Sequence, residues 1–133
     1  MKSGPWALTL NQTSEEPLEE RVTSVVNYFS RAYEDCQWQV SDLDATGKFG
    51  GELTLRLNDG DRPYLKSADL LAVLTEDGQV IDLEVAILVN RQPLFKIIIQ
   101  DGSSVDILGK GMLLPIDVLG DYRTSDPKIF LWN

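Results

Sequence analysis

The feature that most constrains the fold is a run of alternating apolar residues between positions 79 and 108, interrupted by turn sequences. From Gln79 to Val89 apolar side chains recur at every second position, beginning at Ile81. Asn90–Pro93 and Asp101–Gly102 are turn sequences, and each leads into another apolar segment. A period of two with short turns predicts antiparallel strands joined as a meander.

In the N-terminal quarter of the chain, the spacing of apolar residues is different. Between residues 15 and 34, apolar side chains recur at i, i+3, i+4 and i+7, and Thr13 with Glu16 fits a helix capping box. We therefore expect an α+β fold: one long N-terminal amphipathic helix packed on a curved, mainly antiparallel sheet of five to seven strands. A length of 133 residues fits a single globular domain, 1–133.

The remaining segments give weaker signals. Residues 6–10 are predicted to form a short strand or a packed N-terminal arm. Strands are predicted at residues 36–43, 53–57 and 128–132, with loops at 42–51 and 120–127 and a helical turn after Pro115. Ser67–Thr75 is compatible with a short helix capped by Ser67 or with a strand, and the Asp77–Gly78 turn favours the strand of a hairpin.

The residues that are scarce exclude several chemistries. The chain has no histidine, which excludes Ser-His-Asp and Cys-His catalysis and histidine-ligated zinc. Its single cysteine, Cys36, allows no intrachain disulfide, and the alternation places it on a buried face as an inert thiol. The Asn58–Asp61 turn lacks the further ligands of an EF-hand loop. We expect no cofactor, no metal and no catalytic residue.

The charge is strongly negative and uneven. The net charge is −9, and residues 36–90 contain ten acidic against four basic side chains. Such a surface repels phosphate backbones and anionic membranes, so neither nucleic acid nor a membrane is an expected partner. A basic protein would be attracted. The lone cysteine and the absence of a long apolar leader favour the cytoplasm.

Two of the acidic residues share one face of a predicted strand. Asp82 and Glu84 are about 7 Å apart by strand geometry, and a solvated outer face is a better explanation than acid–base catalysis. Across the hairpin, Lys96 is expected to neutralise one of them. The predicted partner-binding residues are the acids of the middle third: Asp42, Asp44, Asp59, Asp61, Glu76, Asp77, Asp82 and Glu84.

These observations favour an acidic protein-interaction module, of the immunity or antitoxin type, that inhibits a basic toxin domain. Two alternatives remain open. A curved sheet that cups a helix is similar to NTF2-like and cystatin-like architectures, which implies a cavity for a small molecule or an enzymatic site, with Tyr28, Trp38, Tyr64 and Asp106 as candidate lining residues. The chain could instead be a structural subunit, and homo-oligomeric, through an apolar surface formed by Leu113, Leu114, Ile116 and Leu119.

Overall fold

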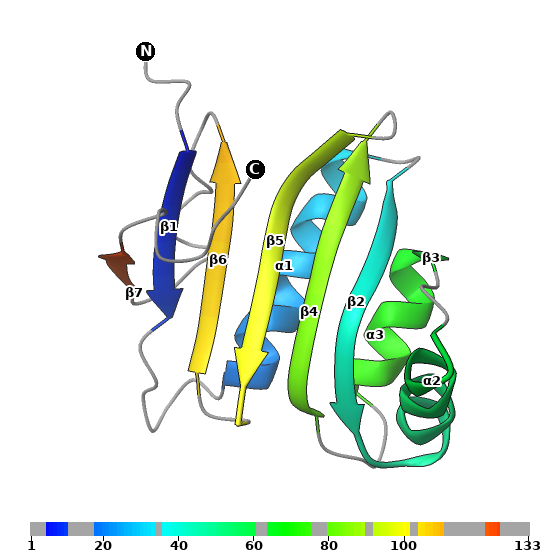
Figure 1. Ribbon diagram of the computed structural model, residues 1–133. Coiled ribbons are helices and arrows are strands. Elements are labelled where there is room, and N and C mark those ends of the chain that lie inside the picture. Colours follow the sequence, from blue (N-terminus) through cyan, green and yellow to red (C-terminus); the bar gives the residue numbers. More distant parts are fainter. Residues whose placement is uncertain are drawn as a thin grey trace.

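A seven-stranded antiparallel sheet forms the centre of the molecule (Figure 1). The computed structural model describes residues 5–10, 18–33, 36–60, 64–75, 80–89, 92–101, 104–110 and 122–125. Across the sheet the strands run in the order β3-β2-β4-β5-β6-β1-β7. Their bounds are β1 Pro5–Leu10, β2 Gln37–Ala45, β3 Tyr64–Leu65, β4 Val80–Val89, β5 Gln92–Gln100, β6 Ser104–Lys110 and β7 Tyr122–Ser125.

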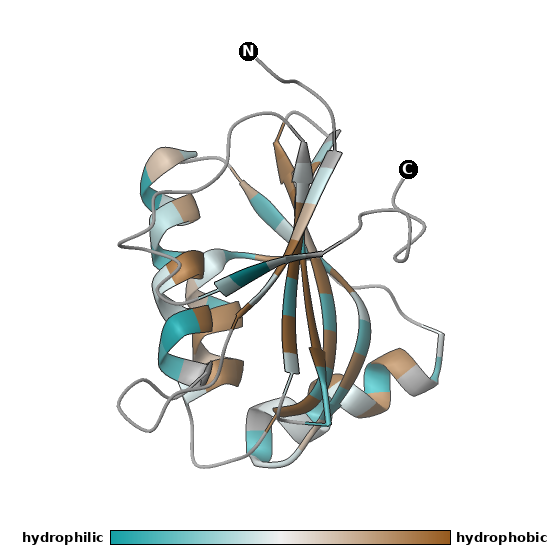
Figure 2. Ribbon diagram, turned by 90° about the vertical axis from the view of Figure 1, so that its left-hand side faces the viewer, coloured by the Kyte–Doolittle hydropathy of each residue, from teal (hydrophilic) through white to brown (hydrophobic). Residues whose placement is uncertain are grey.

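Two helices pack on one face of this sheet. α1 (Leu18–Ala32) lies behind the central strands in Figure 1, and α3 (Ser67–Thr75) lies beside it. Their apolar residues join the inward residues of the strands in one hydrophobic core. Figure 2, in which the strands are seen nearly edge-on, shows apolar and polar residues alternating along them. The opposite surface of the sheet, which we call the open face, therefore presents the other half of this alternation.

The expected meander is confirmed in β4, β5 and β6, which pair consecutively. The expectation of one long helix is only partly right, because α1 has 15 residues and the described chain contains two further helices. None of the helices in these described segments is both long enough and apolar enough to cross a bilayer.

The predicted strand at 53–57 is wrong, and so is the loop predicted before it. β2 continues to Ala45, and Lys48–Asn58 forms a helix, α2, at the β2 edge of the sheet (Figure 1). Three leucines at alternate positions suggested a strand. Leu53 and Leu57 are four residues apart, so a helix buries both, while Leu55 points outward and is 64% exposed.

The hairpin reading of Ser67–Thr75 is also wrong, because this segment is α3. Leu70, Val73 and Leu74 are buried at helical spacing. Ser67 lies at the start of the helix, and its hydroxyl accepts a hydrogen bond from the indole nitrogen of buried Trp38 at 2.8 Å. This contact joins the helix to β2 and gives Trp38 the polar partner that a buried indole requires.

The β7 edge of the sheet also differs from the sequence-based prediction. β7 occupies part of the loop predicted at 120–127, and it pairs with β1. The strand predicted at 128–132 and the helical turn after Pro115 lie outside the described residues, as does the apolar group Leu113, Leu114, Ile116 and Leu119.

A row of aromatic residues crosses the helix-covered face. Trp6, Gly109, Phe95, Ile87 and Trp38 are successive cross-strand neighbours. The Trp6 and Phe95 rings are 5.6 Å apart between centroids, and they fill the space above Gly109. A methyl group at this glycine would lie 2.5 Å from atoms of both rings. The row thus requires a residue without a side chain between Trp6 and Phe95.

Candidate functional site

A β-bulge places two aspartates of β2 on the open face. Val40 is opposite Val85 and Asp42 is opposite Glu84, so Ser41 is an extra residue in β2. Strict alternation from buried Trp38 and Val40 would have pointed Asp42 and Asp44 into the core. After the bulge, Leu43 and Ala45 are buried instead and both aspartates are exposed.

The neighbouring strand contributes two more carboxylates. A second register shift, at Ile81, lets β4 bury Val80 and Leu83 while Asp82 and Glu84 remain half-buried on the open face. This differs from the simple alternation of the sequence, which placed Ile81 with the buried set. Asp82 and Glu84 lie on the outer surface, as the sequence indicated.

The pairing brings these four acids together, and we call Asp42, Asp44, Asp82 and Glu84 the carboxylate cluster. Asp42 is directly opposite Glu84, and Asp44 is directly opposite Asp82. Directly opposed Cβ atoms are about 5 Å apart, and alternate residues of one strand are about 7 Å apart. Two like charges at about 6 Å repel by roughly 0.7 kcal/mol even with the screening of water. The cluster is therefore unfavourable for the sheet that carries it.

Glu84 is held by two neighbours. Ser41 donates a hydrogen bond to Glu84 Oε2 at 2.7 Å, and Lys96 Nζ lies 3.4 Å from the same oxygen. The expectation that Lys96 neutralises one carboxylate is confirmed. Lys96 lies opposite Ala86 rather than Glu84, so it reaches diagonally between the strands.

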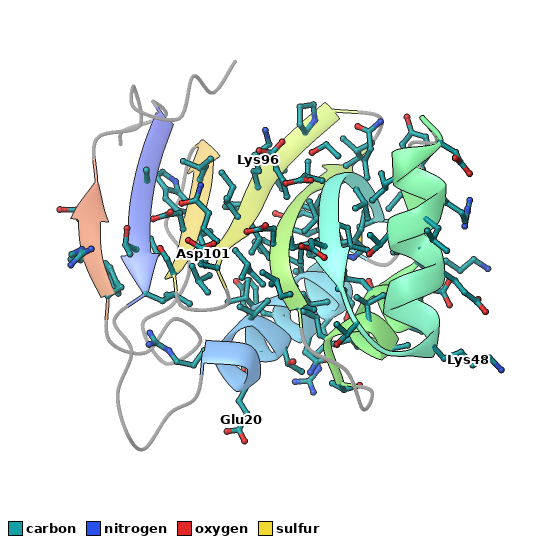
Figure 3. The ribbon with its side chains drawn as sticks, turned by 60° about the horizontal axis from the view of Figure 1, so that its bottom comes forward. Glu20, Lys48, Lys96 and Asp101 are labelled. Atoms are coloured by element: carbon teal, nitrogen blue, oxygen red, sulfur yellow. The ribbon has the colours of Figure 1, made fainter. Side chains whose placement is uncertain are left out.

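Asp82 is held by the turn after β5. The backbone N–H of Asp101 donates to Asp82 Oδ1 at 3.0 Å, and Asp101 adopts a positive φ of 55°. Figure 3 labels Asp101 in this turn and Lys96 on β5. The exposed Asp101 adds a fifth acid beside the cluster, which the sequence analysis missed. The acidic turn was visible, but its position next to Asp82 depends on the register of β4 and β5.

Of the other predicted partner-binding residues, the structure describes only Asp59. Asp59 follows the last residue of α2, and α2 begins three residues after Ala45 at the end of β2. Asp59 is thus exposed at the C-terminal end of α2 and not on β2 or β4. Asp61, Glu76 and Asp77 lie outside the described residues.

The cluster does not have the geometry of a metal site. Among the residues that the structure describes, no group of three or more acidic or cysteine side chains converges to hold a metal ion. Carboxylates on two parallel rows, each several ångströms from the next, suit several separate cationic groups better than one chelated ion.

The residues proposed for a small-molecule cavity do not come together. Trp38 is fully buried on the helix-covered face, whereas Asp106 faces the opposite side of the sheet, where Thr9 donates a hydrogen bond to it. Tyr28 is half-buried on α1, and its ring packs edge-on against Phe29. Tyr64 is 56% exposed on β3. Trp38 and Asp106 therefore cannot line one pocket.

Cys36 agrees with its predicted environment. It is 8% exposed, and its Sγ lies 3.7 Å from the Ser67 hydroxyl that also accepts the Trp38 hydrogen bond.

Comparisons with known proteins identified no relative of this chain. No protein-family model matches the chain, and neither a curated protein nor a solved structure matches it. The carboxylate cluster and its geometry are thus the basis for assigning a function.

Proposed function

We propose that this protein is an acidic interaction module that binds a basic domain through the carboxylate cluster, as an immunity protein or antitoxin binds the toxin that it inhibits. The observation that carries the proposal is the direct opposition of like-charged residues in the register of β2 and β4, Asp42 with Glu84 and Asp44 with Asp82. Directly opposed like charges destabilise a sheet, whereas opposite charges would stabilise it. A cationic partner would remove this penalty when it binds.

The strands also hold the acids in a fixed arrangement. Asp42 and Asp44 are exposed, and within the described part of the chain neither side chain takes part in a hydrogen bond or an ion pair. A partner's lysine or arginine could reach both without displacing anything. The net charge of −9 would raise the rate at which such a partner arrives, and added salt would reduce that rate.

The test compares two variants that remove the same three negative charges. The cluster variant carries Asp42→Asn, Asp44→Asn and Glu84→Gln; the control variant carries Glu20→Gln, Glu52→Gln and Asp69→Asn, at exposed acids on the helices. Each protein is used to capture partners from lysate of its source cells. The association rate of any captured basic protein is then measured between 50 and 300 mM salt.

We expect the wild type and the control variant to retain the same basic protein, with association that slows steeply as salt rises. The cluster variant should lose it. The captured protein should arrest growth when it is expressed alone, and co-expression of this chain should restore growth. Equal retention by the cluster variant, or a captured protein whose expression is harmless, would contradict the proposal.

A further inference from the structure

We draw no further inference here: the strongest candidate, the group of buried side chains that Ala7, Thr9, Asp106 and Leu108 form on the open face of β1 and β6, carries nothing, because no described part of the chain shows what covers it.

Discussion

The two faces of the central sheet differ in the side chains that they present: one buries apolar and aromatic residues, and the other carries opposed acidic residues. The helix-covered face buries Trp38, Phe95 and their neighbours. The Trp38 indole has the Ser67 hydroxyl as its hydrogen-bond partner there, whereas the buried indole nitrogen of Trp6 has none among the described residues. The open face of β2 and β4 instead places like charges directly opposite one another. Around β2 and β4, burial is therefore concentrated on the helix-covered face and negative charge on the other. Substitutions on the two faces should therefore change the free energy of unfolding by different amounts and in opposite directions.

The largest effect is expected from Trp38→Ala on the helix-covered face. Trp38 is fully buried and packs edge-on against Phe29, so its removal leaves a cavity and abolishes the hydrogen bond to Ser67. We expect the free energy of unfolding to fall by about 3–5 kcal/mol. Urea unfolding followed by far-ultraviolet circular dichroism measures it. A loss below about 1 kcal/mol would show that this face does not carry the stability.

A smaller loss is expected from Gly109→Ala in the aromatic row. The new methyl group would lie 2.5 Å from Phe95 Cδ1 and Trp6 Cζ2, so both rings must move. We expect a loss of about 1–3 kcal/mol in the free energy of unfolding. Gly51→Ala in α2 is the control, because nothing lies within 4 Å of its added methyl group. Since alanine favours a helix over glycine, the control should gain roughly 0.5–1 kcal/mol. A loss in the control as large as that at Gly109 would refute the steric explanation.

The smallest effect, of opposite sign, is expected on the open face. Asp44→Asn removes the repulsion with Asp82 directly opposite it, so the free energy of unfolding should rise by about 0.2–1 kcal/mol. Asp69→Asn is the matched control, because Asp69 lies in the first turn of α3, where a negative charge stabilises the helix. The free energy of unfolding of this control variant should fall by a few tenths of a kcal/mol. Thermal unfolding at low salt compares the two variants, and a loss at Asp44 would mean that the opposed acids do not strain the sheet.

The sequence predicted the parts of the fold whose signal is local and long. Strands β4 to β6 combine two-residue periodicity with turn sequences, and α1 has an uninterrupted apolar stripe. The segment from residue 42 to 75 was misread, because three alternating leucines fit a strand and two of them fit a helix equally well. Burial of Leu53 and Leu57 against the rest of the core decides between them, and that is a tertiary effect.

The same limit applies to the candidate site. Composition showed that acids are concentrated in the middle third, and the alternation of β4 placed Asp82 and Glu84 on one outer face. Asp42 and Asp44 were candidates, but the loop predicted for them could not show that they oppose those two residues. Their positions depend on an extra residue in β2, which no local pattern marks. Asp101 joins the same surface only through strand register.

The extra residue at Ser41 has a consequence for how this chain can change over generations. Deleting Ser41 would remove the bulge and restore regular alternation, with Val40 opposite Val85, Asp42 opposite Glu84, Leu43 still inward and both aspartates still outward. Such a deletant should therefore still fold, but it would lose the hydroxyl that donates a hydrogen bond to Glu84 Oε2. The length of β2 can thus vary by this one residue without turning its charged side chains into the core, and the residue's own contribution is the hydrogen bond to Glu84.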